Sequence, residues 1–461
     1  MKRVLFALSS LLLLTLSAAA KPNILWVYVD DMNDWFSCYG ETLIETPNLD
    51  ALAAKGVRFT RAYAPAPVCS ATRSAVMTGC MQTTGGFHNH RTEIKKDLPE
   101  GFVTIPQLFR EAGYSTFNNR KTDYNFKFDP AELYSPELAK IVKTNSYEWM
   151  SQLKDMPFFG QLQFWGGKVG GEAGGKFPAK SRVDQAKVAV PPQYPDTPVF
   201  RNAIARHLEQ TKLMDEELGK LVSALKEHGL WDNTIIFFFT DHGYQLPRAK
   251  QFLFEEGVRV PLVVANLPER KAEVRSDLVN LIDLGPSSLQ LCDIKVPDYM
   301  EGRAVLAKDY QARDYTVVAR DRLDYTIDRI RAVISPRFKY IKNFHPERPL
   351  TSPNYRDGYA SFKELHKLHQ AGELTPLQEQ IFFEPKPEEE LYDLKADPNE
   401  LKNLAKDPAH AETLAQHRQW LAKWIKETGD LGQKPESDEE LKAQLKRWKK
   451  RAVAPEFDRV R

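Results

Sequence analysis

Hydrophobic positions follow two alternating patterns through the first two thirds of the chain. A short apolar run of the kind that forms a buried strand occurs at residues 23–29, and further strand-like runs rich in aromatic and β-branched residues occur at 57–63, 114–118, 158–164 and 234–240. Amphipathic stretches with a helical period occur at residues 48–55, 104–112 and 200–228. This alternation predicts an α/β fold, in which helices cover a mostly parallel sheet.

The pattern changes after about residue 310. Short alternating runs at residues 316–319, 331–334 and 339–341 predict a small antiparallel sheet. The last stretch is a highly charged helix, which we interpret as solvated surface. The expected organisation is a large α/β domain, a smaller C-terminal α+β subdomain and a charged helical tail, over residues 21–310, 311–430 and 431–461.

The first twenty residues have the features of a secretory signal. Lys2 and Arg3 precede an apolar stretch, and the small residues at positions 18–20 form a cleavage site. The apolar stretch is too short to span a bilayer, and no later segment reaches the roughly 20 apolar residues that a membrane helix needs. We therefore expect an exported protein, periplasmic or secreted, that begins at Lys21 and has no membrane partner.

The charge balance and the cysteine content restrict which kinds of protein this chain can be. Without residues 1–20, the chain has 62 basic and 62 acidic side chains, so no overall field attracts nucleic acid. A disulfide scaffold is not expected, because an exported chain of 461 residues would carry more cysteines than the four present, at positions 38, 69, 80 and 292.

Carboxylates follow two of the predicted strands. Asp30 and Asp31 end the strand at residues 23–29, and Asp241 and His242 end the strand at residues 234–240. Ligands bind at the carboxyl ends of strands in open parallel sheets, and an oxygen-rich set suits a hard cation such as calcium. Either pair by itself is equally typical of a solvated turn or loop.

One segment carries a more specific signal. Cys69-Ser-Ala-Thr-Arg73, followed by a helical stretch that ends in Thr78-Gly79, resembles the maturation signature of the sulfatase family. In that family a maturation enzyme oxidises the cysteine to formylglycine, and the hydrated aldehyde supplies the attacking hydroxyl. By itself the motif is also compatible with a buried free cysteine at the start of a helix.

Other landmarks of the family occur in the same order along the chain. They are Thr-Pro-Asn-Leu-Asp at 46–50, Gly-Val-Arg-Phe at 56–59, the strand and Asp-His-Gly at 233–243, the Lys, Glu and Arg-Val-Pro pattern at 250–261, and Glu-Leu-Tyr-Asp-Leu at 390–394. The resemblance covers about residues 22 to 405. It implies an alkaline-phosphatase-like fold and a sulfuric ester hydrolase.

The resemblance also implies roles for individual residues. One divalent ion, most simply Ca²⁺, would be bound by Asp30, Asp31, Asp241, His242 and the formylglycine made from Cys69. Arg73 would hold the formylglycine diol, Lys250 would contact the sulfate oxygens, and Lys121 would be a second active-site lysine.

The chain departs from the family pattern at two histidines. The segment Gly-Tyr-Ser-Thr-Phe-Asn-Asn-Arg-Lys-Thr-Asp at 113–123 has Asp123 where the family has a histidine. Asp123 serves as a base if its pKa is raised, and otherwise is structural. Lys168 occupies the place of the histidine that protonates the leaving alcohol, and can act as an acid if its pKa is depressed. His88 and His90 either supply the missing function or contact the substrate.

The substrate that the resemblance favours is a sulfated carbohydrate. The candidate sugar contacts are Arg322, Asp324, Asp328 and Arg329, together with His345 and Arg348. The alternative for this set is a group of surface salt bridges.

Two other functions stay open at this stage. A phosphoester or phosphonate hydrolase of the same superfamily would use the same metal framework. A catalytically inactive, sulfatase-like protein that only binds glycans would account for the two absent histidines.

Overall fold

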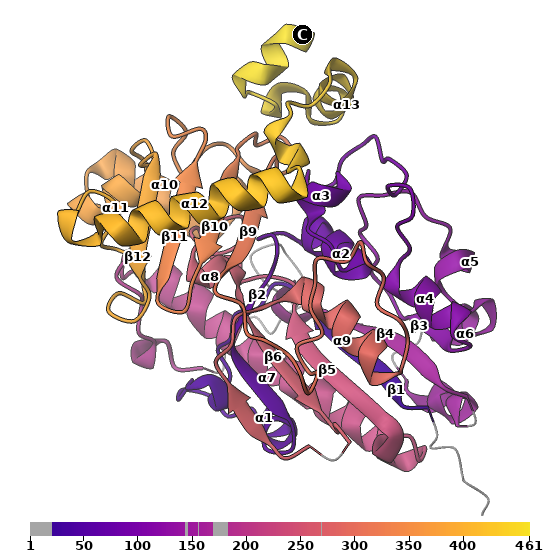
Figure 1. The fold of residues 1–461 in the computed structure, drawn as a ribbon. Coiled ribbons are helices and arrows are strands. Elements are labelled where there is room, and N and C mark those ends of the chain that lie inside the picture. Colours follow the sequence, from indigo (N-terminus) through magenta and orange to yellow (C-terminus); the bar gives the residue numbers. More distant parts are fainter. Residues whose placement is uncertain (1–20, 143–145, 155, 169–182, 269) are drawn as a thin grey trace, which may run out of the picture.

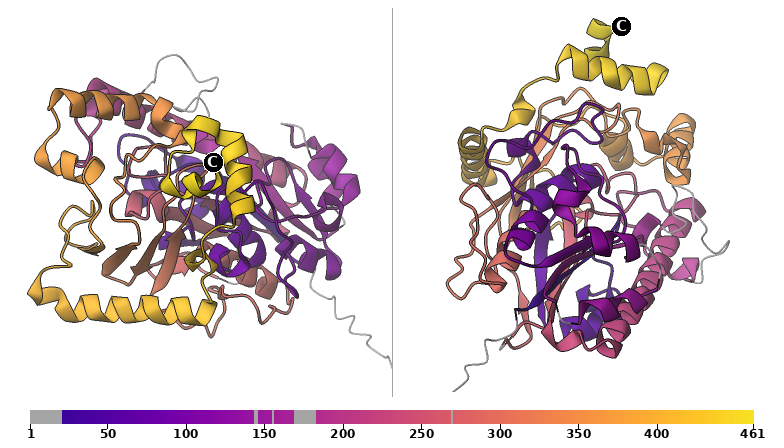
Figure 2. Two further views of the ribbon diagram at one scale, coloured as in Figure 1. Left: turned by 90° about the horizontal axis from the view of Figure 1, so that it is seen from above. Right: turned by 90° about the vertical axis from the view of Figure 1, so that its right-hand side faces the viewer.

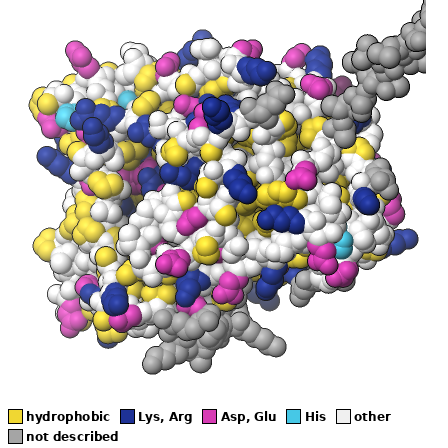
Figure 3. Space-filling model, turned by 90° about the horizontal axis from the view of Figure 1, so that it is seen from below, with side chains coloured by type: hydrophobic (Ala, Val, Ile, Leu, Met, Phe, Trp, Pro, Cys, Tyr) yellow, Lys and Arg dark blue, Asp and Glu magenta, His cyan; other side chains and the backbone are white. Residues whose placement is uncertain are grey.

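The computed structural model describes residues 21–142, 146–154, 156–168, 183–268 and 270–461. The expected signal at 1–20 and the glycine-rich stretch at 169–182 lie outside the described residues. Within the described part of the chain, no helix is long and apolar enough to cross a membrane. On the face shown in Figure 3, acidic and basic side chains are interspersed, in keeping with the balanced charge.

A mixed, mostly parallel sheet forms the centre of the molecule (Figure 1). Its strand order is β3-β4-β1-β5-β6-β2-β7, and β8 also pairs with β2. Neighbours β3, β4, β1 and β5 are parallel, whereas β6 is antiparallel to both β5 and β2. The strands are β1 Asn23–Val29, β2 Val57–Tyr63, β3 Ser115–Asn118, β4 Phe158–Phe164, β5 Thr234–Thr240, β6 Arg259–Ala265, β7 Glu273–Arg275 and β8 Val279–Asn280.

Helices cover both faces of this sheet, as the alternation predicts. On β1, Trp26 packs in one hydrophobic layer with helices α2, α4 and α9, and Val27 packs in the opposite layer with α1 and α7. The two layers follow from the period of two in a strand, which sends successive side chains to opposite faces. The helices of this part are α1 Pro47–Ala53, α2 Cys69–Thr78, α3 Gln82–Gly85, α4 Ile105–Glu111, α5 Pro130–Leu133, α6 Pro136–Ile141, α7 Pro198–Glu227, α8 Glu255–Val258 and α9 Leu284–Leu291.

The second sheet is antiparallel and has the order β12-β11-β10-β9, which confirms the expectation from the alternating runs. Its strands are β9 Thr316–Arg320, β10 Ile330–Ile334, β11 Phe338–Asn343 and β12 Glu389–Asp393. The long helix α12, Ala411–Thr428, runs across this sheet in Figure 1. Helices α10, Ala360–Ala371, and α11, Pro376–Phe382, lie beside it.

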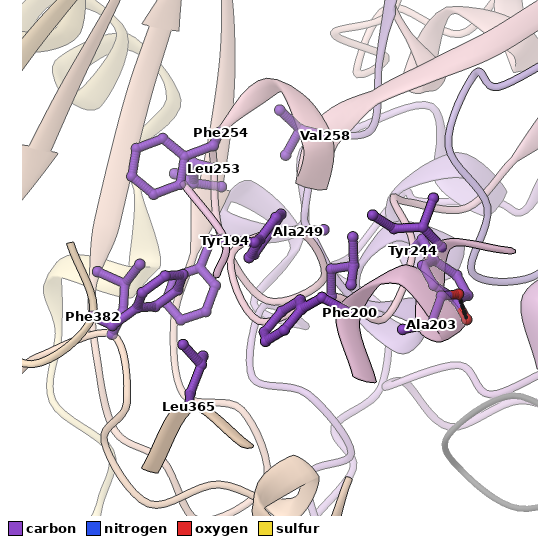
Figure 4. Packing of buried hydrophobic residues seen from close by; sticks show 14 of the residues in the cluster. Tyr194, Phe200, Ala203, Tyr244, Ala249, Leu253, Phe254, Val258, Leu365 and Phe382 are labelled. Carbon is purple, nitrogen blue, oxygen red and sulfur yellow. Dashed lines mark hydrogen bonds between the residues drawn. The ribbon is translucent and has the colours of Figure 1, made fainter. Parts of the chain in front are cut away.

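One hydrophobic cluster joins the two sheets (Figure 4). Phe200 of α7 and Tyr194 belong to the large α/β part, and Tyr194 stacks on both Phe200 and Phe382 of α11. Leu365 of α10 is fully buried in the same cluster. The continuous apolar contact fixes the smaller part against the larger one, because its separation would expose these aromatic side chains to water.

The charged tail is more than the solvated surface that its composition suggests. Helix α13, Asp438–Trp448, buries Leu441 in a small cluster with Tyr325 and Phe457. Arg322 Nε lies 2.7 Å from Glu436 Oε2, so an ion pair also ties the tail to the body. Figure 2 shows the tail above the molecule in its right-hand view. Its few apolar residues, spaced for one helix face, are what dock it.

Candidate active site

The carboxyl ends of four neighbouring strands bring most of the predicted residues together. Asp30 and Asp31 follow β1, Asp241 follows β5, and Lys168 comes four residues after the end of β4. Lys121 follows β3 in the same way. Because these strands are adjacent and parallel, residues far apart in the sequence meet at one edge of the sheet.

Cys69 is the first residue of α2 and is fully buried. Val68, before it, has an extended backbone, so the chain turns into the helix at the cysteine. Backbone N–H groups at a helix start are unpaired by the helix and attract anions. The nearest polar atoms to its Sγ are His242 Nε2 at 3.2 Å, Asp31 Oδ1 and Lys168 Nζ at 3.6 Å each, and Lys250 Nζ at 3.8 Å.

Four side chains form a buried group that can hold a metal ion. The ligand atoms of Asp31, Cys69, Asp241 and His242 all lie within 4.8 Å of one another. Asp241 Oδ2 is buried without a hydrogen-bond partner and has Arg73 Nη2 3.6 Å away, so a closer group bound there would offset the cost of its burial. Two carboxylates, an imidazole and a position that the family oxidises to an oxygen ligand fit a hard divalent cation.

Asp30 lies beside this group but is held by cations of the protein. Its carboxylate is 2.5 Å from Arg73 Nη2, 2.9 Å from Lys168 Nζ and 3.0 Å from Lys121 Nζ. Burial would raise the pKa of Asp30, but Lys121, Arg73 and Lys168 together hold it well below its usual range. Asp30 is therefore ionised, and its charge orients three side chains around Cys69.

The positive charges also act on Cys69 itself. Burial would raise the pKa of the thiol, but Lys121, Lys168 and Lys250 lower it well below its usual value. Asp241 shows the opposite behaviour, since burial raises its pKa to about 7. The site therefore favours a negative charge at the position of the Cys69 side chain.

Two glutamines contribute to the site although the sequence motifs do not single them out. Gln245 Nε2 donates to Asp31 Oδ2 at 2.8 Å, and Gln163 Oε1 accepts from Arg73 Nη1 at 2.6 Å. Gln163 had a detectable signal, because it is one of two polar residues in the otherwise apolar strand β4. For Gln245, the only signal in the sequence was its position three residues after His242.

Asp123 does not have the raised pKa that a base would need. Its carboxylate is 3.2 Å from Arg91 Nη2 and 3.6 Å from Lys121 Nζ. Burial would raise the pKa of Asp123, but Lys121 and Arg91 hold it well below its usual range. The structure thus favours the alternative, in which Asp123 is a structural anion that positions Lys121 and Arg91.

Lys168 lies where the count from the family motif puts it, but its pKa is shifted in the opposite direction to that required of an acid. Burial would lower the pKa of its ammonium group, whereas Asp31, Cys69 and Asp30 raise it well above the usual value. Lys168 is thus a fixed positive charge next to the nucleophile position.

The two candidate histidines face different surroundings. His90 Nδ1 is 2.7 Å from Ser70 Oγ, next to Cys69, and His90 Nε2 is 3.8 Å from Asp324 Oδ2. His88 instead lines a separate cavity of about 250 Å³, for which Cys69 is not a lining residue. Of this pair, His90 belongs to the surroundings of Cys69 and His88 does not.

The predicted sugar contacts also divide into two groups. Asp324 Oδ2 lies 3.8 Å from His90, which contacts Ser70 next to Cys69. Arg322 donates through Nη1 to the Asp324 carbonyl at 2.6 Å, and Arg329 donates to the Gln433 carbonyl at 3.2 Å. Both arginines line the cavity of His88. The remaining three residues also pair within the protein: Asp328 with Lys386, His345 with Glu347, and Arg348 with Glu456. A role for any of the six in sugar binding stays a prediction.

Comparison with known proteins supports the family on most of the chain. The sulfatase family model matches residues 22–294, and a model described as N-sulphoglucosamine sulphohydrolase, C-terminal, matches residues 241–348. An ulvan-active sulfatase from Formosa agariphila is 32% identical over 91% of this chain and 77% of its own. The human N-sulphoglucosamine sulphohydrolase is 27% identical over 91% of this chain and 93% of its own.

The fold is shared more widely. A phosphonate monoester hydrolase from Silicibacter pomeroyi has a TM-score of 0.63 to this structure at 16% identity, over 89% of this chain and 96% of its own. That likeness shows the fold alone. The family model and the sequence relatives decide the class: the chain belongs to the sulfatase family and is a sulfuric ester hydrolase with the alkaline-phosphatase-like fold.

Proposed function

We propose that the protein is an exported sulfatase that releases sulfate from a sulfated carbohydrate, using a formylglycine made from Cys69 and one calcium ion. The observation that carries the proposal is the surroundings of Cys69. Its Sγ lies at the start of a buried helix, within 3.8 Å of two lysine ammonium groups and 3.2 Å of His242. A sulfate group placed there would meet three kinds of anion-stabilising group at once.

The residues around Cys69 divide the work between binding and orientation. Lys168 and Lys250 are close enough to Sγ to pair with sulfate oxygens on the substrate. Arg73 keeps the Asp30 carboxylate in place, and Lys250 is itself oriented by Asp31 at 2.7 Å. When present, formylglycine supplies a hydroxyl nucleophile and calcium supplies charge neutralisation at the sulfate. Asp31, Asp241, His242 and position 69 are the residues that would hold the ion, with Asp30 beside them.

The carbohydrate part of the proposal comes from the relatives. One of them acts on ulvan and another is an N-sulphoglucosamine sulphohydrolase. Both names describe saccharide substrates, and both proteins match this chain over nine tenths of its length. A saccharide panel is therefore the first substrate set to use.

The decisive test measures the modification and the activity in the same preparation. The protein is produced with a formylglycine-generating enzyme, the Cys69 peptide is analysed by mass spectrometry, and sulfate release is followed on ulvan and heparin saccharides. Cys69→Ser, made where serine is not converted, should lose turnover and keep its fold. Cys38→Ser, at a half-buried free thiol, is the matched control and should keep turnover.

Two outcomes would contradict the proposal. Full activity of Cys69→Ser would exclude the formylglycine mechanism. Faster hydrolysis of phosphonate or phosphate monoesters than of every sulfate ester would favour the hydrolase function shared by other proteins of this fold. Export has its own test, in which N-terminal sequencing of protein from the native host should begin at Lys21.

A further inference from the structure

A cavity of about 520 Å³ opens beside the active-site edge of the sheet. One wall comes from the ends of β3 and β4 and includes Asn119, Arg120, Gln163 and Trp165. The opposite wall comes from Tyr147 and from α7 between residues 210 and 220. Its volume is in the range of clefts that hold small organic ligands.

Trp165 is the most exposed tryptophan of the described residues, with half of its side-chain surface open to solvent. The apolar surface of this indole lies open to water at the rim of the cavity, where a ligand that covers it would gain from burial of that surface. The guanidinium of Arg120 lies 5.6 Å from the ring centroid and holds one side of the indole.

Both residues are next to the catalytic groups along the chain. Trp165 is three residues before Lys168, whose Nζ is 3.6 Å from Cys69 Sγ. Arg120 precedes Lys121, whose Nζ is 3.0 Å from Asp30. Gln163, on the cavity wall, accepts a hydrogen bond from Arg73. The cavity wall is thus connected to the Cys69 site on the β3 and β4 side, through Gln163, Arg73 and the Asp30 carboxylate.

The polar groups of the cavity suit a sugar that carries an anionic substituent. Glu217 accepts a hydrogen bond from Tyr147 at 2.8 Å and lies 3.5 Å from Lys220. Carboxylate and amide oxygens accept from sugar hydroxyls, and the cations Arg120 and Lys220 can pair with a carboxylate or a second sulfate. The apolar C–H face of a pyranose ring matches the exposed indole, as aromatic surfaces with a polar rim generally do.

We propose that Trp165 and Arg120 form a saccharide subsite, which binds the sugar unit adjacent to the one that carries the scissile sulfate. This inference rests on the proposed function, since it takes Cys69 as the point of attack. Its consequence is that the enzyme prefers oligosaccharides to sulfated monosaccharides, and that the preference comes from the β3 and β4 side of the site.

The test measures how the effect of replacing Trp165 depends on the length of the saccharide substrate. Sulfate release is measured on a sulfated monosaccharide and on hexasaccharides from ulvan and heparin, for wild type, Trp165→Ala and Trp165→Phe. Stacking on one aromatic ring is worth about three- to tenfold in affinity. Trp165→Ala should therefore raise KM for the hexasaccharide by that factor, with a smaller effect on kcat, and Trp165→Phe should recover most of the loss.

Trp231 provides a matched control. Its ring also lies next to a cation, with Lys226 Nζ 5.1 Å from the centroid. It precedes β5, and so lies at the opposite edge of the sheet from the active site. Trp231→Ala should leave the ratio of hexasaccharide to monosaccharide KM unchanged. Equal KM for both lengths in wild type, or a Trp165→Ala effect confined to kcat, would overturn the subsite. Calorimetric binding of the same saccharides to Cys69→Ala separates this result from the proposed function, because it registers the subsite even if no sulfate is released.

Discussion

Arg73 Nη2 lies 2.5 Å from Asp30 Oδ1, with both side chains buried at the end of β1. Arg73 also packs its guanidinium over the ring of Tyr28, 4.1 Å from the centroid, and donates to Gln163. A buried ion pair of this kind is expensive to break, because removal of one partner leaves the other charged and poorly solvated. The pair therefore links stability and catalysis in one contact.

We expect Arg73→Ala to lower the free energy of unfolding by about 2 kcal/mol, since Asp30 loses the closest of its three buried cations and keeps Lys121 and Lys168. Arg337→Ala is the control, because its pair with Asp393 is exposed on the arginine side and solvent-exposed pairs contribute little to stability. Urea unfolding of both variants measures the difference. Equal losses would show that the buried pair contributes no more to stability than the exposed pair does.

Lys250→Met should reduce kcat/KM for sulfate release by about 100-fold or more while the protein stays folded. The ammonium 3.8 Å from Cys69 Sγ is the interaction removed, and one lost donor to a developing anion commonly has that effect. Lys342→Met, at a surface pair with Glu388, serves as the control and should keep full activity. Steady-state kinetics together with the thermal midpoint of each variant distinguish a lost contact from a lost fold.

Removal of divalent ions should lower both the thermal midpoint and the activity, and added calcium should restore them. A cation that binds only the folded chain stabilises it by about 2.7 kcal/mol at a free concentration 100 times its dissociation constant. Scanning calorimetry with EDTA and with calcium measures the shift. Asp241→Asn, which removes one carboxylate of the buried group, should abolish the calcium response. An unchanged midpoint and full activity in EDTA would remove the metal from the proposal.

Asp324→Asn should stabilise the protein at alkaline pH. Burial raises the pKa of Asp324 to about 6, although Arg91, Arg322, Arg447 and Lys250 lower it. The folded form therefore keeps a proton that the unfolded chain loses near pH 4, so stability falls as the pH rises from 4 to 6 and stays reduced above it. The variant lacks this loss and should gain up to about 3 kcal/mol at pH 8, about half of that at pH 5, and little at pH 4.

Asp328→Asn should change the stability at alkaline pH in the opposite direction. Burial would raise the pKa of Asp328, but Arg320 and Lys386 lower it, so its ionised form stabilises the folded chain above the pKa of the unfolded state. This variant should therefore be less stable than wild type at pH 8. Urea unfolding across the pH range compares the two, and parallel curves for both variants would contradict the assignment.

The sequence by itself determined the elements and the class of the protein. Strands β1, β2, β4 and β5 have the predicted bounds to the residue. In β1, β4 and β5 every residue is buried, and a strand buried on both faces leaves a continuous local signal. Short-range signals were less reliable at the ends of helices. Thr46 is of a residue type that commonly caps a helix and it directly precedes α1, yet its hydroxyl bonds to Ser37 and not to a backbone N–H of the first turn of the helix.

Only the tertiary structure decided how the site is assembled. Strand β4 pairs with β1 across more than 130 residues of sequence, and this pairing is what brings Lys168 to Asp30. The pKa of Asp123 is lowered and that of Lys168 is raised, opposite to the shifts that a base and an acid would need, because each pKa depends on neighbours from other elements. Local periodicity records which face of an element is buried, whereas electrostatic shifts depend on every charge within a few ångströms. Those neighbours exist only once the chain has folded.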